Sequence, residues 1–135
     1  MDCPDNGRSL RQETGYFTWD ILDNLVCIDE VCADIFEFSP AAGASGLPIE
    51  AFLNKIHPPE RERIAKAIHD HLVDGGMYDE EYPLALSSGN RRWVRVVGRM
   101  LLDDDGLPFR GMGTMVDVTF ERLLGVGNAE KATRQ

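Results

Sequence analysis

The feature that most constrains the fold is a long alternating segment, residues 91–103, that lies between two turn sequences. Ser-Ser-Gly-Asn precedes it at residues 87–90, and Asp-Asp-Asp-Gly closes it at residues 103–106. The residues of its wholly apolar face are Val94, Val96, Gly98, Met100 and Leu102. The period of two predicts a β-strand that hairpins join to a strand before it, residues 78–86, and a strand after it, residues 107–118.

Two more strands are predicted near the start of the chain. Residues 15–21 alternate, with Phe17, Trp19 and Ile21 on one side. An Asp-Asn turn then leads to a short apolar run, residues 25–28. This pattern predicts a second β-hairpin.

Three helices are predicted between the two groups of strands. The first covers residues 29–38 and begins at an Asp that can cap it. The second covers residues 49–56, and the third, residues 59–74, carries apolar side chains at every fourth position. Residues 39–48 are small and weakly periodic, so we expect a loop there with room for one helical turn.

The predicted order is β-β-α-α-α-β-β-β, which is typical of an α+β domain: a five-stranded antiparallel sheet with helices packed on one face. Pro83 has no N–H to donate, so its strand is expected at an edge or at a bulge. We expect residues 1–14 to be a flexible tail, residues 15–119 to form the domain, and residues 120–135 to be a C-terminal helix or linker.

Charge and composition exclude several classes of partner. With 135 residues, the chain has the length of one domain. Its net charge of −9 argues against nucleic acid or an anionic membrane surface as the partner. It has no long apolar run or secretory signal, and its three cysteines are a poor disulfide framework, so we expect a cytoplasmic protein.

The charges are also unevenly placed. Residues 15–54 contain seven acidic residues and no Lys or Arg, whereas Arg91, Arg92, Arg95 and Arg99 cluster in one strand. Two interpretations remain open: solvated patches on a monomer, or electrostatic pairing within a dimer or with an output domain.

Five short motifs, in order, resemble those of a PAS domain. Residues 15–20 (Gly-Tyr-Phe-Thr-Trp-Asp) resemble Gly-x-Trp-x-Trp-Asp, and residues 56–61 (Ile-His-Pro-Pro-Glu-Arg) resemble His-Pro-x-Asp-Arg. Residues 81–84 (Glu-Tyr-Pro-Leu) resemble Glu-Tyr-Arg-Leu, and residues 89–94 (Gly-Asn-Arg-Arg-Trp-Val) resemble Asp-Gly-x-x-Arg-Trp-Val. Residues 111–119 end in Asp-Val-Thr, similar to Asp-Ile-Thr. The resemblance covers about residues 13 to 122.

The resemblance implies the PAS fold and a role in signal transduction. Phe17 and Glu60 depart from the motifs but keep an apolar and an acidic character, whereas Pro83 removes the side chain that makes contacts in relatives. Members of this family often form homodimers, and they transmit signals into a helix that follows the Asp-x-Thr motif.

One candidate ligand pocket lies between the apolar sheet face and the helices. Its expected residues are Trp19, Phe36, Phe52, Ile64, Ile68, His71, Tyr82, Val94, Val96, Gly98 and Met100. Gly98 has no side chain and is expected to leave a hollow. Two interpretations stay open: side chains that fill the space to native density, or a cavity that holds a ligand.

The sequence identifies no particular cofactor, and we expect that none is bound. The Asn-Cys-Arg-Phe motif of flavin-adduct relatives is absent, so a flavin–cysteine adduct is excluded, whereas a non-covalent flavin is not. Haem relatives use a histidine of the long helix, and His71 falls beside Ile64 and Ile68, so haem is not excluded either. His69 and His71 diverge on a helix, so we expect no metal site.

No catalytic residues are predicted, because the three histidines and the scattered acidic residues show no spacing that would bring them together for acid–base or nucleophilic catalysis. If the domain were a small enzyme, Asp34 or Asp117 would be a candidate base. Asp117 is expected instead to act with Thr119, as hydrogen-bonding groups where the last strand becomes a helix.

The mixed face of the long strand is a candidate dimer interface. Its residues are Trp93, Arg95, Val97, Arg99 and Leu101. Trp and Arg are enriched in interface hot spots, although a solvated face covered by Arg stems is the alternative.

The leading hypothesis is a cytoplasmic sensory and dimerisation module, part of a signalling system such as a two-component system. Ligand or partner state would pass through Asp117 and Thr119 to an output domain, in the same chain or in a separate protein. A histidine kinase or a cyclic-nucleotide enzyme is the expected output. The alternative is a stand-alone small-molecule-binding protein or small α+β enzyme that uses the same pocket.

Overall fold

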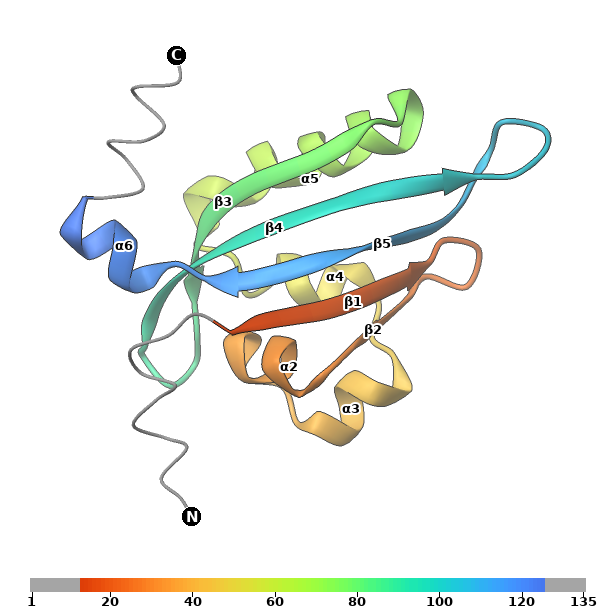
Figure 1. Ribbon diagram of the computed structural model, residues 1–135. Coiled ribbons are helices and arrows are strands. Elements are labelled where there is room, and N and C mark those ends of the chain that lie inside the picture. The colour runs from red at the N-terminus through yellow and green to blue at the C-terminus, as the bar shows by residue number, and fades with distance from the viewer. Residues whose placement is uncertain (1–12, 126–135) are drawn as a thin grey trace.

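The computed structural model describes residues 13–125, which form one antiparallel sheet and the helices around it (Figure 1). The strands are β1 (Thr14–Asp20), β2 (Leu25–Ile28), β3 (Met77–Ala85), β4 (Arg91–Leu102) and β5 (Pro108–Asp117). The helices are α2 (Glu30–Phe36), α3 (Pro40–Ser45), α4 (Ile49–Leu53), α5 (Pro58–Asp74) and α6 (Thr119–Leu124).

The strands lie in the order β2-β1-β5-β4-β3, so the first and last strands of the chain meet inside the sheet. Every neighbouring pair is antiparallel. Helices α4 and α5 lie behind the sheet in Figure 1, and α2 and α3 lie beside β1 and β2. The predicted α+β architecture with a five-stranded antiparallel sheet is therefore confirmed.

The segment between residues 39 and 48, where a loop with room for one helical turn is predicted, contains a six-residue helix, α3. Four helices rather than three therefore separate β2 from β3. Ser39 accepts a hydrogen bond from the backbone N of Ala42 at 3.1 Å, and Pro40 occupies the first turn. A capping serine followed by proline favours a helix start, and it outweighs the weak apolar period.

Pro83 lies on an edge strand, as predicted. Its carbonyl accepts a hydrogen bond from the backbone N of His57 at 2.9 Å, on the side of β3 away from β4. Its partner Trp93 directs its own backbone groups toward Val118 and Thr119 instead. The missing N–H of Pro83 therefore removes no hydrogen bond between β3 and β4.

The predicted boundaries move by one or two residues at several ends, and helix α4 ends at Leu53, three residues before its predicted end. Strand β1 begins at Thr14 and helix α5 at Pro58. Helix α2 ends at Phe36, because Glu37 adopts a left-handed conformation. Of the predicted tail and C-terminal helix, residues 1–12 and 126–135 lie outside the described residues. No helix among residues 13–125 is both long enough and apolar enough to cross a membrane.

Candidate functional site

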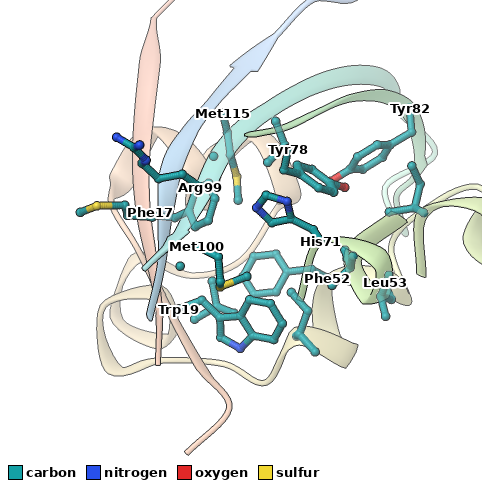
Figure 2. A pocket seen from close by; sticks show the side chains of 18 of the residues that line it. Phe17, Trp19, Phe52, Leu53, His71, Tyr78, Tyr82, Arg99, Met100 and Met115 are labelled. Carbon is teal, nitrogen blue, oxygen red and sulfur yellow. The ribbon is translucent and has the colours of Figure 1, made fainter. Parts of the chain in front are cut away.

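A cavity of about 80 Å³ lies between the inner face of the sheet and helices α4 and α5 (Figure 2). Side chains or backbone of all five strands line it. Ten of the eleven residues predicted for the pocket do so: Trp19, Phe36, Phe52, Ile64, Ile68, His71, Tyr82, Val96, Gly98 and Met100. Whether a ligand occupies this space stays a prediction.

Val94 is the predicted pocket residue that lies outside the lining. It is fully buried in the hydrophobic core, opposite Tyr82 on β3 and Asp117 on β5. This position is near the start of β4, next to the junction with α6, whereas the cavity lies further along the strand at Val96, Gly98 and Met100. Alternation predicted the face correctly, but it does not say how far along that face the cavity extends.

The hollow expected above Gly98 is partly filled by Phe17. A Cβ atom at Gly98 would lie 3.3 Å from Cζ of Phe17 and 2.8 Å from the backbone O of Met112. Phe17 and Gly98 both lie opposite Gly113, one on each neighbouring strand. The aromatic ring therefore packs over a pair of glycines, which allow the backbones to approach closely.

Several residues of the lining are absent from the sequence prediction. They are Phe17, Val26, Ile49, Leu53, Ile56, Tyr78, Arg99, Gly111, Met112 and Met115. The alternation of Phe17 with Trp19, and of Tyr78 with Tyr82, was a usable signal. The apolar residues of helix α4 recur with the spacing of a buried helix face, but this spacing does not show which buried positions border the cavity.

Aromatic side chains form the wall that helices α2 and α4 contribute. The ring centroid of Phe52 lies 5.2 Å from that of Phe36 and 5.0 Å from that of Phe38, both in edge-on contacts. Lys55 places its ammonium group 4.3 Å from the centre of the Phe38 ring. Such pairs add specific geometry to the burial of area, and they hold this wall in place.

His71 is the main polar group of the cavity. Its side chain extends from α5 between Phe52 and Tyr78 (Figure 2), and the residue is 8% exposed. Its Nε2 atom is buried and has no hydrogen-bond partner among the described residues. The ring of Tyr78 lies edge-on at 5.8 Å. A buried nitrogen without a partner is costly, so it marks a place where a polar group of a ligand would be stabilised.

Two tyrosines contribute further polar atoms to this region. Burial raises the pKa of both Tyr78 and Tyr82 above the usual value for a phenol, and the neighbouring Glu80 raises it further. Both phenols are therefore neutral at physiological pH, and neither offers a charge to the cavity.

Asn24, in the turn between β1 and β2, positions two parts of the cavity wall, Trp19 and helix α4. The Oδ1 atom of Asn24 accepts hydrogen bonds from Nε1 of Trp19 at 3.0 Å and from the backbone N of Ile49 at 3.2 Å. Its amide donates to Glu50 at 2.9 Å. Helix α4 has no capping side chain of its own, so Asn24 satisfies the first N–H of that helix and orients the Trp19 indole.

The junction between β5 and α6 has the contacts expected of Asp117 and Thr119. The Oδ1 atom of Asp117 accepts from the backbone N of Thr119 at 2.9 Å and from its hydroxyl at 2.6 Å. The same hydroxyl oxygen accepts from the backbone N of Trp93 at 2.9 Å. The start of α6 is therefore hydrogen-bonded to β4, the strand whose inner face borders the cavity.

The outer face of β4 is partly covered by the chain itself. Trp93 is half-buried beneath Arg122 of α6, and Arg95 makes two hydrogen bonds to Asp79, at 2.9 and 2.6 Å. Val97 and Leu101 are half-buried, and Arg99 is exposed. The five residues predicted for a dimer face thus share one face, but two of them have partners within the chain.

The site contains little that would bind a metal or hold a large cofactor. Within residues 13–125, no group of three or more His, Cys, Asp or Glu is placed to hold a metal ion. His69 is exposed while His71 is buried, so the two diverge as expected. Pockets for drug-sized ligands measure roughly 300–1,000 Å³, so a flavin or haem does not fit this cavity unless the surrounding side chains move.

Comparisons with known proteins agree on the fold. A family model described as PAS fold matches residues 26–115. The sensor protein FixL of Bradyrhizobium diazoefficiens is 27% identical over 73 residues, which are 54% of this chain and 14% of FixL. The matched segment is thus a small part of that relative.

Two solved structures are similar over most of their length. One is a sensory box histidine kinase/response regulator from Burkholderia thailandensis, with a TM-score of 0.72 and 23% identity over 98% of this chain and 95% of that one. The other is the N-terminal domain of a diguanylate cyclase with PAS/PAC sensor from Marinobacter aquaeolei. Its TM-score is 0.73, with 16% identity over 82% of this chain and 99% of that one. At these identities the two structures support the fold.

Proposed function

Because this chain belongs to the PAS fold family, we propose that it is a sensory and dimerisation module that couples the state of its cavity to an output domain. The output would be a histidine kinase or a cyclic-nucleotide enzyme, joined to the same chain or carried by a partner protein. Relatives named as a sensor protein, a histidine kinase and a diguanylate cyclase support this assignment.

The hydrogen bond between Trp93 and Thr119 is the observation that carries the proposal. Strand β4 borders the cavity at Val96 and Gly98, and three residues earlier it is tied to the first residue of α6. A shift of β4 caused by a ligand would change this contact directly. If this contact has two discrete arrangements, with and without ligand, each would favour a different state of an output domain connected to α6.

We also propose that the module works as a homodimer in the cytoplasm. The exposed side chains of Phe120, Leu123 and Leu124 on α6 would extend the outer sheet face into a dimer surface. The described cysteines, Cys27 and Cys32, are both free, which suits a reducing compartment. Sedimentation of the purified chain would test the dimer, and a monomer at high micromolar concentration would contradict it.

The coupling can be tested in a fusion of residues 1–135 to the catalytic region of a histidine kinase. Ile68→Phe would place a larger side chain at the cavity, and we expect it to change the autophosphorylation rate. Asp117→Ala or Thr119→Val should remove that response, because each breaks the junction. Asp104→Ala in the exposed β4–β5 turn is the control and should leave the response intact.

The outcome also separates the proposal from its alternative, a stand-alone small-molecule-binding protein or enzyme. A cavity variant that changes kinase output only when the junction is intact supports the sensory module. A response of equal size in all junction variants would contradict the coupling through Asp117 and Thr119. No observation on the described residues favours a catalytic role over this one.

A further inference from the structure

The size and lining of the cavity restrict the ligand that the proposed sensor would take. An engineered cavity of roughly 150 Å³ holds benzene, which has six non-hydrogen atoms. The present cavity measures about 80 Å³, so by proportion it has room for roughly three or four such atoms. Only a very small molecule would therefore fit this cavity.

The lining also restricts the charge of that molecule. Among the lining residues Arg99 is the one that carries a charged side chain, and it is exposed. Figure 2 shows its guanidinium directed away from His71. An ionised group inside an apolar cavity without an opposite charge is strongly disfavoured, so a carboxylate or an ammonium group does not suit this lining.

A polar contact is nevertheless available at His71, beside the phenols of Tyr78 and Tyr82 that also line the cavity. Nε2 of His71 is buried, has no partner among the described residues, and lies among apolar and aromatic side chains. Imidazole nitrogens donate or accept according to the tautomer, so a hydroxyl or a carbonyl group would each match it. A ligand with such a group would satisfy the nitrogen and leave its short hydrocarbon part against the apolar lining.

We propose that the cavity binds an uncharged molecule of about three or four non-hydrogen atoms with one hydroxyl or carbonyl group, hydrogen-bonded to Nε2 of His71. The inference rests on the proposed sensory function and names the chemical class of its ligand. The binding free energy available to a very small ligand is limited by its number of non-hydrogen atoms. The dissociation constant is then no tighter than roughly 0.5 mM for a three-atom ligand and roughly 0.04 mM for a four-atom ligand, so the sensor would respond to an abundant small molecule.

The test is an NMR titration of the full chain with 1-propanol, which follows the backbone amides of Gly98 and Gly111 in the cavity lining. We expect shifts that saturate at millimolar concentrations. His71→Phe removes the hydrogen bond but keeps an aromatic ring, and it should weaken binding by at least about fivefold. His71→Gln keeps both donor and acceptor and should bind 1-propanol within about threefold of the wild type.

Two further probes keep the result decisive. Xenon fills apolar cavities without hydrogen bonds, so it should shift the same amides in the wild type and in His71→Phe, which verifies that the variant keeps its cavity. Equal affinities of both proteins for 1-propanol, with xenon binding retained, would overturn the assigned contact. Acetate that binds more tightly than 1-propanol would overturn the uncharged class, and the absence of saturation with every probe would overturn the ligand site itself.

The failure of this inference is distinguishable from the failure of the proposed function. The titration uses the chain without any output domain, so it is independent of kinase coupling. Binding of 1-propanol through His71 together with a fusion kinase that ignores the cavity variants would leave the ligand class standing and reject the coupling. Coupling without 1-propanol binding would reject the ligand class alone.

Discussion

The guanidinium of Arg122 lies over the indole ring of Trp93, with its central carbon 3.8 Å from the ring centroid. The same guanidinium is hydrogen-bonded through Nε to Glu81 at 3.0 Å, and the two charged side chains are only 18% and 10% exposed. Helix α6 is thereby held against β3 and β4 on the face of the sheet opposite the cavity. This contact and the Asp117–Thr119 junction are two separate attachments of the same short helix.

Removal of the Arg122 side chain should loosen α6. Arg122→Ala loses the cation–π contact and leaves the mostly buried carboxylate of Glu81 without this partner, so we expect the free energy of unfolding to fall by about 1–3 kcal/mol. Urea denaturation measures the loss, and hydrogen exchange of the α6 amides should become faster. Arg91→Ala, an exposed arginine at the start of β4, is the control and should change stability by less than about 0.5 kcal/mol. Equal losses in both variants would contradict a specific role for Arg122.

The glycine pair at the centre of the sheet should tolerate no added methyl group at Gly113. A Cβ atom there would lie 2.6 Å from Cα of Gly98 and closer still to the backbone O of Val97. Backbone atoms cannot move aside as a flexible side chain does, so Gly113→Ala should cost about 3 kcal/mol of stability.

Gly111 on the same strand provides a matched control for that prediction. Its Cβ would meet no atom closer than 3.4 Å, and that nearest atom is the sulfur of Met100. Gly111→Ala should therefore change the midpoint of thermal unfolding only slightly. If the two alanine variants unfold at the same temperature, the prediction that β4 and β5 approach too closely at Gly113 for a methyl group is wrong.

Most of the fold was predictable because its signals are local and periodic. The strands around residues 91–103 follow from alternation and flanking turns, and Pro83 indicates an edge strand because it lacks an N–H. For the segment that contains the short helix α3, the sequence predicts a loop with room for one helical turn, because its six residues have no apolar period. Ser39 and Pro40 are a local signal for a helix start, but two residues do not indicate how far the helix extends.

The sequence predicts which face of the sheet borders the candidate site, but not the contacts that its side chains make. Alternation placed Val96, Gly98 and Met100 on the cavity floor, whereas the ring of Phe17 over Gly98 depends on the register between β1, β5 and β4. The contact between Asn24 and Ile49 joins residues 25 positions apart. Such pairs depend on tertiary packing, which no local pattern encodes.

Asn24 should prove important for stability although it lies in a turn. Asn24→Ala would leave the indole N–H of Trp19 and the backbone N of Ile49 without their acceptor, and we expect a loss of about 1–3 kcal/mol. The indole N–H resonance of Trp19 should shift in NMR spectra. Asn54→Ala, an exposed asparagine at the end of α4, should leave that resonance in place. An unchanged Trp19 resonance in Asn24→Ala would contradict the contact.

Cys32 should be far less reactive than Cys27. Cys32 is fully buried and Cys27 is half-exposed. Burial raises the pKa of the Cys32 thiol well above its usual range, and the nearby carboxylate of Asp29 raises it further. Since the thiolate is the reactive form, a Cys3→Ser variant should show one reactive thiol near pH 8 under native conditions and two after denaturation. Rapid reaction of both thiols in the folded protein would contradict this burial.

The hairpin between β3 and β4 is attached to helix α2 by a contact that should respond to pH. Glu37 accepts hydrogen bonds from the Ser88 hydroxyl at 2.7 Å and from the Asn90 amide at 3.0 Å. The hydrogen bond from Ser88 is the main cause that holds the pKa of the Glu37 carboxyl below its usual value, and Asn90 and the charge of Arg92 lower it further.

The sign of the pH effect follows from this lowered pKa. A carboxylate whose pKa is lower in the folded state than in the unfolded state contributes stability above its unfolded pKa, which is about 4.3. That contribution is lost as the pH falls through the folded value. Wild type should therefore be more stable than Glu37→Gln at pH 7, and urea unfolding should show this difference shrinking as the pH is lowered below about 4. In a Ser88→Ala background the pH dependence of the difference should be smaller, because the main hydrogen bond is already gone. A difference between wild type and Glu37→Gln that stays constant down to pH 3 would show that the carboxylate makes no such contact in solution.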